Sequence, residues 1–134
     1  MKKIYQLLIL LSCFLPVLSF SQTVNGQKTD KEILDLLCHK WQLTYMGTHG
    51  KLTAVPPGLT TYLLINKDGS LLETDGGTEY PGKWTLSHRV LSVTNDGKGP
   101  VEKYTIIQVT ATELIYESNE DGTTTTMKFR QVDQ

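Results

Sequence analysis

From Trp41 onward, short β-prone runs alternate with turn signals, and this alternation constrains the fold more than any other feature of the chain. The turn signals are "THGK", "VPPG", "NKDG", "TDGG", "LSHR", "NDGKGP", "TATE" and "NEDG". Gly, Pro, Asn and Asp supply the backbone conformations that tight turns need. The runs between the signals predict about eight strands, at residues 40–46, 60–66, 70–75, 81–86, 90–94, 102–109, 112–117 and 122–131.

One short helix precedes these strands, in "TDKEILDLLCHK". Thr29 and Glu32 have the spacing of a capping box, and Ile33, Leu34 and Leu37 form an apolar stripe. No further helical stretch exists to connect parallel strands, so consecutive strands should pair antiparallel. Pairing the first strand with the last would remove both open edges. We therefore predict an all-β fold, an antiparallel up-and-down barrel of about eight strands with one short N-terminal helix over one mouth.

The hairpin expected at "INKDGSL" illustrates the predicted register. Asp68-Gly69 offers a turn with a positive φ, which places Ile65 opposite Leu71 and Leu64 opposite Leu72. Elsewhere, strict alternation points large aromatic side chains inward. The expected interior residues are Trp41, Tyr45, Trp84, Tyr104, Tyr116 and Phe129.

An eight-stranded barrel is either filled by its side chains or wide enough for one small ligand. Two interpretations therefore remain open. The first is a non-catalytic protein that binds a small hydrophobic molecule through the six interior aromatics. The second is a filled barrel that serves as a structural or protein-interaction domain of the cell envelope. The long connection 47–60 would lie at a mouth of the barrel and is the candidate gate for a ligand.

The first residues have the pattern of a signal peptide. Lys2 and Lys3 precede an uncharged apolar run at 4–20, and small residues stand at Ser19 and Ser21. Signal peptidase requires small residues at this spacing, so we expect cleavage after Ser21 and export to the periplasm or the cell exterior.

The chain is thus expected to comprise a signal peptide at 1–21, a flexible segment at 22–28 and a barrel domain at 29–134. Lipidation at Cys13 is the less favoured alternative, because the residues that follow it are still hydrophobic. The mature chain would keep only Cys38, so no internal disulfide is expected. It would also contain no transmembrane segment, and we expect a monomer.

Little in the sequence favours catalysis or nucleic-acid binding. The mature chain would carry 11 basic and 14 acidic residues, which argues against a nucleic-acid partner. His39, His49 and His88 show none of the spacings of metal or nucleophile motifs. We therefore expect no enzymatic activity, no metal and no cofactor.

A series of short motifs resembles a known family. The helix leads into "HKWQL", which is followed by "INKDGSL", "PGKWTLSHRVLSV", "YTIIQVTATELIYES" and "TTMKFRQV". This order resembles the lipocalin-like domains found in exported proteins of Bacteroidota. The resemblance implies a small barrel with an apolar ligand, and it implies that Arg130 stacks on Trp41 as a structural pair. His39 stands where the superfamily has Gly, which is a departure from the pattern.

Overall fold

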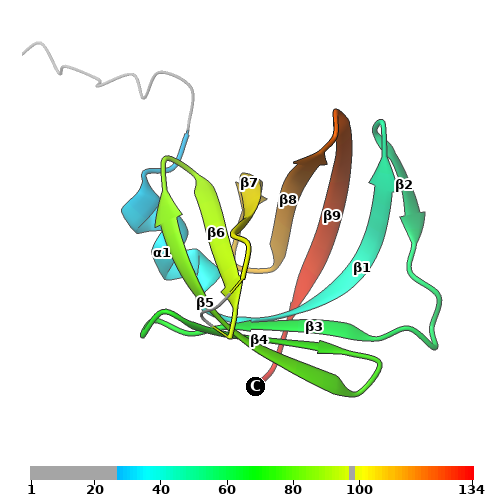
Figure 1. Ribbon diagram of the computed structural model, residues 1–134, viewed down its shortest axis with the longest axis horizontal. Coiled ribbons are helices and arrows are strands. Elements are labelled where there is room, and N and C mark those ends of the chain that lie inside the picture. The colour runs from blue at the N-terminus through cyan, green and yellow to red at the C-terminus, as the bar shows by residue number, and fades with distance from the viewer. Residues whose placement is uncertain (1–26, 97–98) are drawn as a thin grey trace, which may run out of the picture.

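The computed structural model describes residues 27–96 and 99–134, and this part of the chain contains one helix and nine strands (Figure 1). The expected signal peptide and the site of cleavage lie outside the described residues. The elements are α1 (Asp30–Leu37), β1 (Lys40–Thr48), β2 (Lys51–Ala54), β3 (Thr61–Ile65), β4 (Ser70–Asp75), β5 (Thr78–Ser87), β6 (Val90–Asn95), β7 (Glu102–Val109), β8 (Glu113–Glu120) and β9 (Thr123–Val132).

Eight of the strands form the closed antiparallel barrel predicted from the sequence. The order is β1-β3-β4-β5-β6-β7-β8-β9, and β9 pairs back with β1 to close the sheet. The predicted hairpin register is confirmed, since Ile65 pairs with Leu71 and Leu64 pairs with Leu72. Gly69 has the positive φ, +86°, that this turn requires.

The ninth strand, β2, was not predicted. It occupies part of the long connection and pairs with the last four residues of β1. β3 pairs with the first three residues of β1, Lys40 to Gln42. All four residues of β2 are exposed, so the strand lacks the alternation of apolar and polar residues that indicates a half-buried strand.

Helix α1 covers one end of the barrel (Figure 1). The predicted capping box is present: the Thr29 amide donates to Glu32 Oε2 at 2.7 Å, and the Glu32 amide donates to Thr29 Oγ1 at 3.3 Å. Ile33 and Leu37 are fully buried against the strands, and Leu34 packs beside them. Because an eight-residue helix is not stable alone, this apolar contact is what keeps α1 folded.

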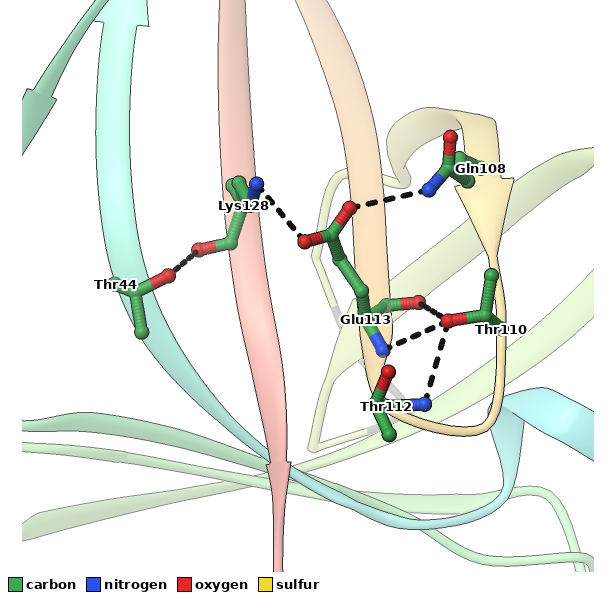
Figure 2. Close-up of polar contacts among 6 residues, drawn as sticks. All are labelled: Thr44, Gln108, Thr110, Thr112, Glu113 and Lys128. Carbon is green, nitrogen blue, oxygen red and sulfur yellow. Dashed lines mark hydrogen bonds and ion pairs between the residues drawn. The ribbon is translucent and has the colours of Figure 1, made fainter.

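Two β-bulges interrupt the regular alternation of the barrel wall. In β1, Leu43 pairs with Phe129 and Tyr45 with Lys128, so Thr44 is the extra residue. Thr44 Oγ1 donates to the carbonyl oxygen of Lys128 at 3.0 Å, as Figure 2 shows. In β7, Ile107 is the extra residue opposite β8. A bulge reverses which side chains face inward beyond it.

Candidate ligand cavity

A cavity of about 500 Å³ lies in the barrel, and neither Trp41 nor a residue of α1 lines it. Its walls combine residues of β1, β2, β3, β4, β7, β8 and β9 with the connection that follows β2. The lining residues are Leu43, Met46, Thr53, Ala54, Val55, Pro56, Leu59, Thr61, Leu63, Glu73, Asp75, Tyr104, Tyr116, Met127 and Phe129. The surface offered to a ligand is therefore mainly apolar, with few polar groups.

Three aromatic rings form one continuous wall of the cavity. The ring centroids of Tyr104 and Tyr116 lie 4.6 Å apart, and those of Tyr116 and Phe129 lie 5.0 Å apart, both pairs tilted. Neighbouring strands β7, β8 and β9 carry them. The hydroxyl of Tyr104 donates to Glu102 Oε2 at 2.6 Å. Burial is the main cause that raises the pKa of Tyr104, and the hydrogen bond to Glu102 raises it further. The phenol therefore stays neutral.

Two carboxylates from β4 also reach the cavity. Glu73 and Asp75 are two residues apart and therefore face the same side of the strand. Thr61 Oγ1 donates to Asp75 Oδ1 at 3.0 Å near the start of β3. Burial raises the pKa of Glu73, and the negative charges of Glu102 and Asp75 raise it further. Among the described lining residues none is basic.

The connection after β2 closes over one side of the cavity. The backbone amide of Val55 donates to the carbonyl oxygen of Thr44 at 2.9 Å, which ties this segment to the β1 bulge. Val55, Pro56 and Leu59 line the cavity, and Leu59 remains exposed. The predicted long connection thus lies beside the cavity, although its first part is the β1–β2 hairpin.

Of the six aromatics predicted to line the interior, three border the cavity: Tyr104, Tyr116 and Phe129. The two tryptophans are buried but contribute to the closed end of the barrel instead. Trp41 Nε1 donates to the carbonyl oxygen of Leu37 at 2.9 Å. Trp84 Nε1 donates to the carbonyl oxygens of Asn66 and Ser70, at 3.0 and 3.1 Å. The Trp41 indole therefore anchors the end of α1, and the Trp84 indole anchors the β3–β4 turn.

The expected inward orientation of Tyr45 is wrong. Its side chain is 43% exposed, and Lys128 Nζ lies 5.9 Å from the centroid of its ring. The bulge at Thr44 reverses the alternation, so that Leu43 and Met46 line the cavity and Tyr45 faces solvent.

The expected pairing of Arg130 with Trp41 is not formed. Arg130 pairs in register with Gln42, and its Nε and Nη2 donate to Gln42 Oε1 at 3.0 and 2.7 Å. Trp41 is the neighbour of Gln42 in the strand, and its fully buried side chain lies on the opposite face of the wall. Arg130 is exposed and remains outside the barrel.

Sequence reasoning missed Glu73 and Asp75 as cavity residues. The signal for them was present, because alternation in "LLETD" puts Leu71, Glu73 and Asp75 on one face of the strand. The apolar residues of the connection carried no such signal, since residues outside a strand follow no fixed alternation.

The part of the chain that the structure describes contains neither a metal site nor a membrane-spanning helix. Within residues 27–96 and 99–134, no group of three or more His, Cys, Asp or Glu side chains is placed to hold a metal ion. The one helix in this part of the chain is not long and apolar enough to cross a membrane.

Comparison with known proteins gave a family match. A family model described as a lipocalin-like domain matches residues 37–116. A search among curated proteins found no match. Among solved structures, an uncharacterized protein from Bacteroides eggerthii DSM 20697 is similar to this chain, with 17% sequence identity and a TM-score of 0.45. That similarity covers 70% of this chain and 98% of the other chain.

Proposed function

Because this chain belongs to the family of lipocalin-like domains, we propose that it binds one small hydrophobic molecule inside its barrel and performs no chemistry on it. The observation that carries the proposal is the cavity of about 500 Å³. Ligand sites in proteins commonly enclose roughly 300–1,000 Å³ and are mostly apolar with a few polar groups. A barrel filled by its own side chains would lack such a space, so the cavity favours the binding function over a purely structural one.

The division of the interior supports this proposal. At the end beside α1, the core is filled by Trp41, Leu91 and Leu114, which are fully buried. Beyond them, the interior widens into the cavity, whose far side is bordered by exposed Met46 and Leu59. A half-filled barrel of this kind has a closed floor and an apolar opening. The 55–60 connection then serves as the gate through which the ligand passes.

A neutral dye tests the proposal. N-phenyl-1-naphthylamine fluoresces strongly only in apolar surroundings, so saturable enhancement at one dye per chain is the expected result. Met46→Trp should lower the affinity, because the indole would occupy the cavity mouth. Tyr45→Trp is the matched control on the adjacent residue, whose side chain faces solvent, and it should bind the dye as the wild type does. No saturable binding, or equal effects of the two substitutions, would contradict a ligand site in this cavity.

We also propose that the protein is exported, with cleavage after Ser21 and a monomeric mature chain. The positively charged start, the apolar run and the small residues before the cut support the export and the site of cleavage. Mass spectrometry of the protein from its own cells should give a chain that begins at Gln22. A chain that begins at a lipid-modified Cys13 would instead show a lipoprotein.

A further inference from the structure

Glu73 is placed directly across the barrel from the aromatic wall. It lies on β4, and Tyr116 lies on β8, four strands away in a barrel of eight. Both side chains line the cavity, together with Tyr104. A ligand in the cavity therefore meets both a carboxylate and aromatic rings.

The carboxylate of Glu73 has no partner of its own within the described residues. Asp75 accepts a hydrogen bond from Thr61, and Glu102 accepts one from Tyr104. The two ion pairs in this part of the chain, Lys67–Asp35 and Lys128–Glu113, lie elsewhere. Glu73 is also only partly exposed, so water compensates it incompletely.

The charges around the cavity all have the same sign. Glu73, Asp75 and Glu102 are acidic, and none of the described lining residues is basic. An anionic ligand such as a fatty acid would be repelled by these groups in a site of reduced polarity. A cation would instead be attracted by the carboxylates and by the electron-rich faces of the tyrosine and phenylalanine rings.

We propose that the ligand is an organic ammonium compound, with its charged nitrogen at Glu73 and its apolar body along the aromatic wall and Leu63. This inference rests on the proposed function, because it specifies the class of molecule that the same cavity binds. A primary ammonium group donates hydrogen bonds to the Glu73 carboxylate, while its carbon chain fills the space between Leu43, Met127 and Phe129.

Three probes with one carbon chain and different charge test the inference. Decylammonium, decanol and decanoate compete with N-phenyl-1-naphthylamine at neutral pH, each below its micelle concentration. Decylammonium should displace the dye at a concentration about tenfold lower than decanoate, with decanol between them. Glu73→Gln should weaken decylammonium about tenfold and leave decanol within about twofold, because a charge-assisted hydrogen bond is lost.

Glu79→Gln is the control for a change of net charge. Glu79 is exposed and lies on the neighbouring strand β5, outside the cavity lining, so all three affinities should be unchanged. Decanoate binding as tightly as decylammonium, or decylammonium unaffected by Glu73→Gln, would overturn the ammonium assignment and leave the proposed cavity function standing. Failure of the dye and of all three probes to bind would overturn both. If the Glu73→Gln variant does not fold, the order of the three probe affinities for the wild-type protein decides whether the ammonium assignment stands.

Discussion

Asp30 and Arg89, 59 residues apart in the chain, are joined by a hydrogen bond of 3.0 Å from the Arg89 amide to the Asp30 carboxylate. The amide of His88 donates to the same carboxylate at 2.8 Å. His88 and Arg89 form the β5–β6 turn with φ of +49° and +64°, a conformation unusual for residues other than glycine. The first residue of α1 therefore holds a strained turn in place and attaches the helix to the closed end of the barrel.

This contact predicts a pH-dependent loss of stability. The hydrogen bonds from the Arg89 and His88 amides hold the pKa of Asp30 below its usual value of 3.8. Because the folded-state pKa is lowered, the contribution to stability is complete above pH 3.8 and is lost as the pH falls below that value. Asp30→Asn should therefore lower the melting temperature at neutral pH, and the difference from wild type should shrink in acid.

Thermal unfolding of both proteins across this pH range measures the effect. Asp35→Asn is the control, because the Asp35 side chain makes one long ion pair, to Lys67 at 4.0 Å, and both side chains are mostly exposed. A difference between Asp30→Asn and wild type that stays constant into acid would contradict the role given to the carboxylate.

The hydrogen bond of the Trp41 indole predicts that its removal lowers the stability of the fold. Its indole nitrogen donates to the Leu37 carbonyl at the end of α1, and the contact is buried. Trp41→Phe keeps an aromatic ring but removes the donor, so we expect a loss of about 1–3 kcal/mol in the free energy of unfolding. Chemical denaturation measures this loss. Ligand affinity should change little, because Trp41 is not among the cavity-lining residues, and a larger effect on dye binding than on stability would contradict this placement.

The contacts of Arg89 and Arg130 predict that replacement by Ala lowers the free energy of unfolding by different amounts at the two positions. The Arg89 guanidinium donates to the carbonyl oxygens of Ile106 and Ile107, at 3.0–3.2 Å, and so stabilises the β7 bulge. Among the described residues, the Arg130 guanidinium donates only to the side chain of Gln42, on the exposed face. We expect Arg89→Ala to cost about 1–3 kcal/mol and Arg130→Ala less than about 1 kcal/mol. Chemical denaturation of both variants decides, and a larger loss for Arg130→Ala would contradict this assignment.

The sequence predicted those features that follow from regular alternation and turn chemistry. The pairing of Ile65 with Leu71 was one of them, because a two-residue period and one turn determine the register. The orientation of Tyr45 was not predictable in this way. Thr44 bulges through a hydrogen bond to Lys128, a residue 84 positions away, and nothing local in "QLTYM" indicates that contact.

The size of the cavity also depends on relations that the sequence does not show. Alternation identified Tyr104, Tyr116 and Phe129 as inward residues, but it could not separate filled from open space. That distinction depends on how the connection after β2 lies against β1, where the Val55 amide meets the Thr44 carbonyl. Arg130 was assigned to Trp41 by resemblance alone, and the register placed it beside Gln42 instead.

The surroundings of Glu73 predict that its carboxylate lowers the stability of the empty barrel while it strengthens the binding of the ligand. Its pKa is raised by burial and by the charges of Glu102 and Asp75, so ionised Glu73 destabilises the empty barrel. A raised folded-state pKa of an acid means that the destabilisation is fully present well above the usual value of 4.5 and disappears as the pH falls below it.

Glu73→Gln should therefore raise the melting temperature of the ligand-free protein at neutral pH. The gain should diminish as the pH falls towards 4.5, because a carboxyl group with a raised pKa is protonated above that usual value. Glu79→Gln, on the exposed face, should leave the melting temperature nearly unchanged. A lower melting temperature for Glu73→Gln would mean that the carboxylate stabilises the empty barrel. A carboxylate retained at a cost to stability is expected where the ligand, rather than the fold, uses its charge, and the opposite result would remove that reason for placing the ligand's ammonium group at Glu73.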